Sequence, residues 1–502
     1  MADKRPNILF ICSDQHTPRV MGAYGDRIIA TPNLDALAAE GCRFDSFYCN
    51  NPVCCPSRMS LMTGRYSFQC ESITNQSVLD SRIPTLAHIA VRGGYHAVLA
   101  GKMHFNGPDQ RHGFLERPMG EASTLGLLNG GDRKPAEPKY VRWLGNCSRP
   151  EPLFYTGAGG NALADYDLAV TSATEGWLDG YAKAGDVAPP FFLTVGFLLP
   201  HCPYIAPRKV YDKYDGRVTA PHLARDQLDA LHPHHKDFRK YIQLDDVPPA
   251  NFDRAAVAYY GLTDQLDQNV GRIFDSLNRN GLWENTIVIY TSDHGEMLGQ
   301  HGRWHKESFY EDSVRVPFVV RHPSQKMPAS VAAHCSLVDL MPTLCEWMGV
   351  KPPPGLDGTS LVPILAGAAA DPNRTVKAET YTFWHTHKPG LSSNRMVRRG
   401  PWKLCYYGAY DAYELFNLVD DPEETNDVSR SPGNEAIVRE LRAEIFSDGW
   451  SADTAQKIEE RLAGFGHPEN MKEFRDVLRS NPLPMDSPDQ WPAWATARTF
   501  LE

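Results

Sequence analysis

No part of this 502-residue chain is apolar over the length that a membrane-spanning helix requires. Positive charge is also in short supply, with 51 Lys and Arg against 61 Asp and Glu and a formal net charge of −10. Long-range repulsion would oppose binding to a nucleic acid, although a small anion could still bind in a locally basic cleft. Internal repeats and low-complexity tracts are missing as well. The sequence therefore predicts a globular protein with neither a membrane nor a nucleic acid as partner.

The N-terminal segment does not have the pattern of an export signal. Its apolar run, Asn7 to Cys12, is short and suits a buried strand better than a signal peptide. The eleven cysteines are an odd number and are scattered along the chain. Without an export signal we expect them to be reduced and the protein to be cytoplasmic.

Buried strands alternate with amphipathic helices through most of the chain. Continuous apolar runs predict strands at 7–12, 96–100, 190–201, 286–291 and 314–323, while periodic apolar residues with caps predict helices at 32–40, from Pro84, 252–280 and 337–348. This alternation is typical of βαβ units, and it predicts an α/β fold with a large, mostly parallel sheet sandwiched by helices. The histidine-rich stretch from His232 to His235 could bind a metal, but a polar loop is the favoured interpretation.

The sequence changes character after about Pro372, where short alternating segments predict a small antiparallel sheet. We therefore expect a catalytic domain at 1–371, a C-terminal α+β subdomain at 372–450, and a tail at 451–502. The tail is rich in Pro and Trp and would pack on its own body or on a neighbouring subunit. It is the reason for expecting a homo-oligomer, either a dimer or a tetramer.

Charged and metal-binding side chains follow the ends of several predicted strands. Asp14 follows the first strand, Lys102 and His104 follow another, His201 ends the next, and the pair Asp293-His294 comes after 286–291. The carboxyl ends of parallel strands form the ligand crevice of an open sheet, so we expect these groups to lie together.

Two kinds of ligand suit these residues. Asp14, Gln15, Asp293 and His294 offer oxygen ligands for a hard divalent cation, and the imidazole keeps a transition metal possible. The alternative to a metal site is that the aspartate caps a helix and that the Asp293-His294 pair lies in an ordinary loop. Lys102, His104 and Lys306, together with Arg58, would bring positive charge and proton donors for a tetrahedral oxyanion such as sulfate or phosphate.

The segment Cys54-Cys55-Pro56-Ser57-Arg58, followed by Leu-Met-Thr-Gly-Arg at 61–65, resembles the signature of the type I sulfatases, which belong to the alkaline phosphatase superfamily. The stretch GGYHAVLAGKMH resembles the second signature, with Ala97 where Ser or Thr is usual, and LLPHCPY and HGRWHKESFYEDSVRVPFVV resemble further segments in the expected order. The motifs are most similar to those of bacterial choline-sulfatase-like and phosphonate monoester hydrolase-like members. The resemblance implies the sulfatase fold, with its smaller C-terminal subdomain.

The resemblance also implies a modified residue and a metal. Only Cys54 has proline two residues later, so it would be the cysteine that a formylglycine-generating maturation enzyme converts to formylglycine (3-oxoalanine). One divalent metal would be held by Asp14, Gln15, position 54, Asp293 and His294, with Ca²⁺ expected and Mn²⁺ or Mg²⁺ as alternatives. Gln15 stands where most sulfatases carry a second aspartate, which removes one negative charge from that site.

The mechanism that the resemblance implies begins with attack of the formylglycine hydrate on sulfur, which forms a covalent sulfo-enzyme. His201 would protonate the departing alcohol, and Lys306 would bridge the sulfate and the leaving group. His104 would then take the proton of the remaining hydroxyl so that sulfate is expelled. Arg58 and Lys102 would hold the formylglycine oxygens.

Three functions remain open at this point. The favoured one is a sulfatase that hydrolyses small aryl or alkyl sulfate esters. A phosphonate monoester hydrolase or phosphodiesterase could use the same site, because sulfate and phosphate esters share tetrahedral geometry. A binding protein with an unconverted Cys54 and an anion pocket is the third possibility.

Overall fold

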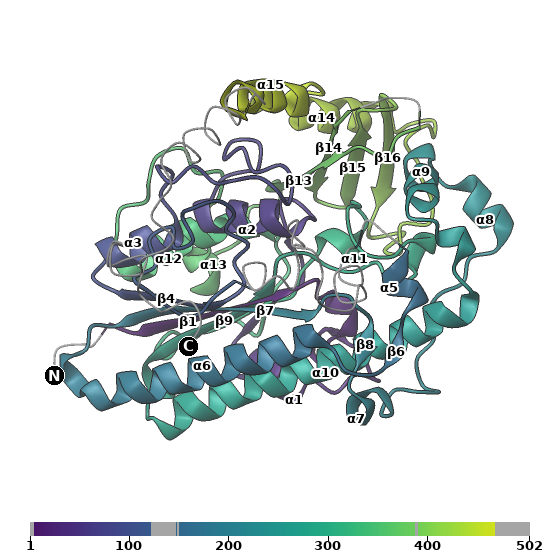
Figure 1. Ribbon diagram of the computed structural model, residues 1–502. Coiled ribbons are helices and arrows are strands. Elements are labelled where there is room, and N and C mark those ends of the chain that lie inside the picture. Colours follow the sequence, from purple (N-terminus) through teal and green to yellow (C-terminus); the bar gives the residue numbers. More distant parts are fainter. Residues whose placement is uncertain (1–4, 122–146, 148–149, 387–389, 467–502) are drawn as a thin grey trace, which may run out of the picture.

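The computed structural model describes residues 5–121, 147, 150–386 and 390–466 (Figure 1). Its main feature is an eight-stranded sheet in the order β11-β2-β10-β9-β1-β7-β4-β5. In that order the strands are Ser330–Val331, Cys42–Phe44, Phe318–Arg321, Thr286–Ser292, Asn7–Asp14, Phe191–Pro200, His96–Gly101 and Glu116–Met119.

Most of the sheet is parallel. Strand β1 pairs in parallel with β7 on one side and with β9 on the other, so that Ile8 is opposite both Phe192 and Ile287. Strands β4 and β5 continue this direction, whereas β10 runs antiparallel to β9 and to β2. The predicted α/β class with a large, mostly parallel sheet is therefore confirmed.

Helices cover both faces of this sheet (Figure 1). Alternate side chains of β1 enter two different apolar clusters, with Leu9 and Ile11 in one and Ile8 and Phe10 in the other. The first cluster is completed by α1 (Pro32–Glu40), α6 (Ala162–Ala184) and α10 (Pro249–Arg279), and the second by α2 (Cys54–Thr63), α3 (Leu86–Arg92) and α12 (Leu340–Met348). Burial of both faces explains why the central strands β1 and β7 are almost continuously apolar.

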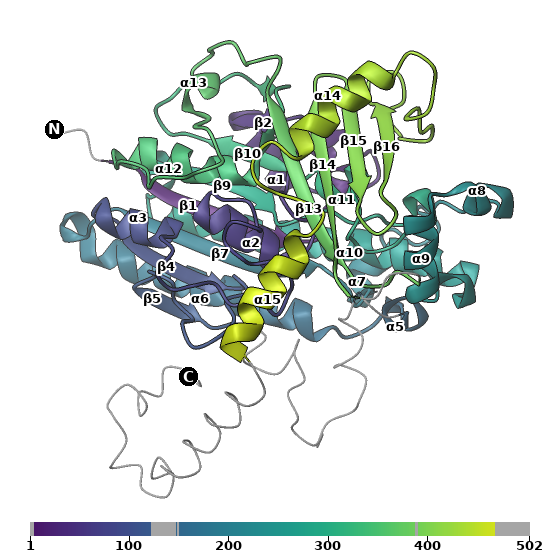
Figure 2. The same cartoon turned by 90° about the horizontal axis from the view of Figure 1, so that it is seen from above.

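A second, four-stranded antiparallel sheet lies beside the helices of the second cluster (Figure 2). It consists of β13 (Thr375–Thr382), β14 (Ser392–Arg399), β15 (Trp402–Tyr407) and β16 (Ala412–Asn417), and α14 (Glu435–Ile445) and α15 (Thr454–Gly466) pack on it. Val376 and Met396 of this sheet share an apolar cluster with Met341 of α12. The domain boundary at 371/372 stays a prediction. Residues 467–502 of the predicted tail lie outside the described residues.

Shorter elements connect these layers. They are β3 (Phe47–Tyr48), β6 (Gly157–Ala158), β8 (Ile205–Ala206), β12 (Cys335–Ser336), α5 (Glu151–Phe154), α7 (Arg208–Tyr211), α8 (Arg225–Ala230), α9 (Pro233–Tyr241), α11 (Glu311–Val314) and α13 (Val362–Leu365). Among the helices of the described residues, none is at once long and apolar enough to cross a membrane.

The prediction of a polar loop at 232–235 is wrong. Helix α9 begins at Pro233, and His234 and His235 are buried on it. The ring of His234 stacks on Tyr407 of β15 with a centroid distance of 4.3 Å. Tyr407 is far from these histidines in the sequence. Because the contact is not local, the spacing of the three histidines could not predict that they would be buried.

Candidate functional site

Four of the predicted site residues lie at the carboxyl ends of neighbouring strands. Asp14 ends β1, Asp293 follows β9, Lys102 follows β4 and His201 follows β7, and the order of these strands in the sheet is β9-β1-β7-β4. Because parallel neighbours end at the same edge, the side chains meet there. The sequence-predicted residues Asp14, Gln15, Cys54, Arg58, Lys102, His104, His201, Asp293, His294 and Lys306 are all buried.

Four of these side chains form a compact group of possible metal ligands. One ligand atom from each of Asp14, Cys54, Asp293 and His294 lies within 4.8 Å of the others. Nδ1 of His294 donates a hydrogen bond to the carbonyl of Gly295 at 3.0 Å, so Nε2 is left to face the group, 3.3 Å from Cys54 Sγ. A hydrogen bond at the far nitrogen is the usual way in which a protein orients a metal-binding imidazole.

Positively charged side chains balance the negative charge of this group. Arg58 donates from Nε to Asp293 at 2.8 Å and from Nη2 to Asp14 at 3.3 Å, and Lys102 makes an ion pair with Asp14. Burial and Cys54 oppose ionisation of Asp14, but Lys102, His201 and Lys306 outweigh them and hold the pKa of this carboxyl below its usual value. The Asp14 carboxylate is therefore ionised. Burial and Asp14 raise the pKa of Asp293 against the effect of Arg58, which orients both side chains.

Helix α2 presents Cys54 to the group from its first turn. The helix ends at Gly64, which has a φ of 67° and forms the C-cap by donating to Ser60 O. A Cβ at Gly64 would lie 2.6 Å from Cβ of Met341, so this position requires glycine both for its backbone conformation and for the close approach of α12. The Leu-Met-Thr-Gly segment thus fixes the helix whose N-terminus carries Cys54.

The Cys54 thiol is surrounded by positive charge. Lys306 Nζ lies 3.2 Å from its sulfur. Burial alone would raise the pKa of Cys54, but Lys102, Lys306 and His294 outweigh this effect and hold it well below its usual value. An anionic group at position 54 is therefore favoured, whether a thiolate or an oxyanion.

Gln15 is held in one orientation. Its amide nitrogen donates to Glu296, and its amide oxygen accepts from Lys306 Nζ at 2.7 Å. The backbone N–H of Gln15 donates to Asp293 at 3.1 Å. The oxygen is therefore turned toward the cations of the site, as a neutral metal ligand would require.

Two histidines lie beside this group of side chains. Nε2 of His201 is 4.0 Å from Asp14 Oδ1, and Nδ1 donates to the carbonyl of Cys202 at 2.6 Å. Burial and Lys306 oppose protonation of His201, but Cys147 and Asp14 outweigh them and raise its pKa to about 10. His104 contributes a hydrogen bond that lowers the pKa of Cys54. His201 thus suits a proton donor, and His104 lies beside position 54.

Backbone strain is concentrated in this region. Gln15, His104, His305 and Glu307 have φ values of 67°, 62°, 66° and 63°, in the left-handed region that side chains other than glycine rarely occupy. Each such residue costs on the order of 1–3 kcal/mol, and residues of this kind collect at functional sites.

Three residues that sequence reasoning missed hold the site together. Ser57 donates to the backbone carbonyl of Asp293, and so joins α2 to the end of β9. Glu296 fixes Gln15, and it also accepts from Tyr204 at 2.8 Å. Glu121 accepts from the backbone N–H of His104 at 2.9 Å. Ser57 belongs to a quoted motif, but its contact, like those of Glu296 and Glu121, is not local, and no spacing rule reveals it.

The donor set fits a divalent metal. Two carboxylates, an imidazole and position 54 converge with one amide oxygen nearby, and the Asp14 carboxylate is ionised. Oxygen donors suit a hard cation such as Ca²⁺ or Mg²⁺, and the imidazole of His294 also suits Mn²⁺.

Comparisons with known proteins agree with this geometry. The Sulfatase family model matches residues 6–350, and the model for the C-terminal region of N-sulphoglucosamine sulphohydrolase matches residues 299–448. Choline-sulfatase of Rhizobium meliloti is 33% identical over 448 residues, which cover 86% of this chain and 84% of that protein. N-acetylglucosamine-6-O-sulfatase of Bacteroides thetaiotaomicron is 26% identical, with 85% and 83% covered.

A solved structure shares the fold. The phosphonate monoester hydrolase of Agrobacterium radiobacter superposes with a TM-score of 0.72 at 26% identity, covering 88% of this chain and 95% of that one. The family match spans the sheet and every strand end that carries the site. The chain belongs to the sulfatase family of the alkaline phosphatase superfamily, whose members include hydrolases of sulfate esters, and it is such a hydrolase.

Proposed function

We propose that this protein hydrolyses sulfate esters of small aryl or alkyl alcohols, with formylglycine at position 54 as the source of the nucleophilic oxygen. The observation that carries the proposal is the position of Cys54. Its side chain leaves the first turn of α2 between Lys306 Nζ at 3.2 Å and His294 Nε2 at 3.3 Å. The positive charge of Lys306, together with a helix N-terminus, favours an oxyanion there and the anionic ester beside it.

Each nearby side chain has a role that its contacts support. Lys306 already binds the amide oxygen of Gln15 and is positioned to bind a sulfate oxygen. His201, with its raised pKa, would donate a proton to the leaving oxygen. His104 would accept a proton from position 54, and Lys102 would hold an oxygen there. Arg58 acts through the carboxylates of Asp14 and Asp293, which it keeps oriented.

A metal would be held by Asp14, Gln15, position 54, Asp293 and His294. It would supply Lewis-acid stabilisation of negative charge on the ester oxygens. Ca²⁺ is our first choice because carboxylate and amide oxygens dominate the donor set, with Mn²⁺ and Mg²⁺ as alternatives. The proposal also includes a maturation enzyme that modifies Cys54, reduced cysteines in the cytoplasm, and a homo-oligomer. In the structure all eleven cysteines are free.

The direct test is turnover of a panel of aryl and alkyl sulfates by protein made together with a maturation enzyme and loaded with Ca²⁺. We expect sulfate release that depends on the maturation enzyme. Equal activity in protein made without maturation would contradict the formylglycine proposal. Full conversion of position 54 without sulfate release from any ester of the panel would contradict the proposed substrates.

Hydrolysis of phosphonate monoesters or phosphodiesters is a second candidate. The similarity to a phosphonate monoester hydrolase structure favours it, since the match covers nearly the whole of that chain. Both kinds of ester are tetrahedral, and the cations that surround position 54 would serve either one. Side-by-side kcat/KM values for an aryl sulfate, a phosphonate monoester and a phosphodiester separate the candidates. A sulfatase activity far below the other two would favour the second.

A further inference from the structure

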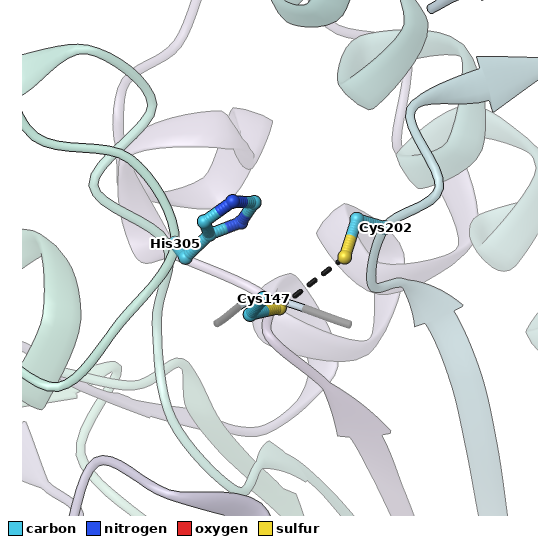
Figure 3. A group of neighbouring side chains, drawn as sticks. All are labelled: Cys147, Cys202 and His305. Carbon is cyan, nitrogen blue, oxygen red and sulfur yellow. Dashed lines mark hydrogen bonds between the residues drawn. The ribbon is translucent and has the colours of Figure 1, made fainter. Parts of the chain in front are cut away.

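A second group of possible metal ligands lies beside the catalytic cluster. It comprises Cys147, Cys202 at the turn after β7, and His305, which come from three separate parts of the chain and face a common space (Figure 3). One ligand atom from each lies within 4.8 Å of the others, and the two sulfurs are 3.2 Å apart. Neither thiol reacts in the proposed hydrolysis, although Cys147 helps to raise the pKa of His201.

The imidazole of His305 is oriented as a ligand. Nδ1 lies 3.0 Å from the hydroxyl of Tyr204, which itself donates to Glu296 at 2.8 Å. Nε2 is buried and has no hydrogen-bond partner among the described residues, and the side chain is only 1% exposed. A buried nitrogen left without a partner costs about 1–3 kcal/mol, so its retention indicates an occupant that satisfies it.

The ligand chemistry selects a class of metal. Two thiolates and an imidazole are the donors of borderline-soft cations, with Zn²⁺ first, and this Cys₂His set leaves a fourth position open. It differs from the oxygen-rich cluster around Asp14, which suits a hard cation. Cys202 and His305 are buried, while Cys147 is partly exposed and provides a route of entry. The two groups would therefore bind different metals.

The second group also contacts the catalytic machinery. The Cys147 sulfur lies 3.5 Å from Nε2 of His201 and 3.6 Å from the amide oxygen of Gln15. Because Nε2 of His201 lies this close to the Cys147 sulfur, it is positioned to become the fourth ligand of a cation that Cys147 holds. Occupancy would thus remove the proton donor that departure of an alcohol requires.

We propose that Cys147, Cys202 and His305 form a second metal site, selective for Zn²⁺-class cations, and that its occupancy inhibits hydrolysis by disabling His201. The binding half of this inference is independent of the proposed function, and the inhibitory half rests on it.

The binding test uses Co²⁺ as a spectroscopic substitute for Zn²⁺ in reduced, Ca²⁺-saturated protein. All variants carry Cys54→Ala, so that no thiol remains in the first group of ligands. We expect a thiolate-to-cobalt charge-transfer band that Zn²⁺ abolishes by displacement. In this background, Cys202→Ala or His305→Ala should weaken Co²⁺ binding. The loss of affinity should exceed the roughly 10–100-fold that follows when only a hydrogen-bond partner of a metal ligand is removed.

The matched control is Cys345→Ala, which removes a buried thiol on α12 that belongs to neither group. It should leave the band and the affinity unchanged, and circular dichroism establishes that each variant is folded. No band in the Cys54→Ala protein, or the same band with Cys202→Ala as with Cys345→Ala, would overturn the site.

The inhibition test uses matured protein with Cys54 otherwise intact. Zn²⁺ should slow hydrolysis of an alkyl sulfate far more than hydrolysis of nitrophenyl sulfate, because only the alkyl leaving group needs the proton of His201. For Cys202→Ala, the rate with Zn²⁺ should equal the rate of the same variant without metal. Cys345→Ala should still be inhibited by Zn²⁺. Equal inhibition of both substrates, or full inhibition of Cys202→Ala, would overturn the link to His201 even where the binding test succeeds.

Discussion

Replacing His201 with asparagine should distinguish substrates by their leaving groups. The imidazole follows β7, and its Nδ1 is fixed by the carbonyl of Cys202, so the proton available for transfer is on Nε2. The pKa of His201 is raised to about 10 because Cys147 and Asp14 outweigh burial and Lys306. The residue is therefore protonated at neutral pH, as a general acid must be.

The expected size of the effect depends on the alcohol. A positioned general acid contributes about 10²–10⁴-fold to the rate, which corresponds to about 3–5 kcal/mol of the barrier. An alkyl alkoxide is a poor leaving group and needs this contribution, whereas nitrophenolate departs without a proton. We expect His201→Asn to lower kcat/KM for an alkyl sulfate by about 10²–10⁴-fold and for nitrophenyl sulfate by less than about tenfold.

The assay is steady-state hydrolysis of both esters from neutral to alkaline pH. The protonated form of His201 is the active one and its pKa is raised, so alkyl sulfatase activity should persist above the ordinary imidazole pKa and fall as pH rises toward about 10. His96→Asn is the control. His96 begins β4 and so lies at the end of the strand opposite to the site, and its replacement should leave both rates unchanged. Equal losses on both esters in His201→Asn would refute the assignment of the proton donor.

Three further predictions concern the modified residue, the helix that carries it and the metal. Cys54→Ala should abolish sulfate release, while Cys55→Ala should retain most of it; the reverse result in the same assay would show that the motif has been aligned incorrectly. Gly64→Ala should lower the free energy of unfolding by about 2–4 kcal/mol, since it adds a clash with Met341 to an unfavourable backbone conformation. Gly281→Ala, with a φ of 65° and open space, should cost only about 1 kcal/mol in the same urea titration, and equal costs would contradict the packing argument. Chelation should inactivate the matured enzyme and lower its Tm, and Ca²⁺ at about 100 times its Kd should restore about 2.7 kcal/mol of stability; a Tm that does not change with either treatment would contradict metal binding at this site.

Much of the fold could be predicted from the sequence because its signals are local. The apolar run at Asn7 marks β1, and Pro32 and Gly41 bracket α1 as expected. The convergence of Asp14, His201 and Asp293 followed from one rule about parallel strands, and the structure has those strands as neighbours.

Other parts depend on contacts that no local pattern encodes. Helix α2 was not anticipated, because every one of its residues is buried and it has no polar face to give a helical period. Helix α3 begins at Leu86 rather than at Pro84, since Thr85 caps it through His88. The role of Ser57 and the grouping of Cys147 with His305 arise only when the chain is folded.

The central claim is that position 54 is formylglycine in the active enzyme, and mass spectrometry of the tryptic peptide 44–58 tests it most directly. In matured protein the peptide should be about 18 Da lighter than its thiol form, with the change located at Cys54 and not at Cys49 or Cys55. The converted fraction should rise in proportion to kcat across preparations. Full activity in protein whose Cys54 is an intact thiol would contradict the account.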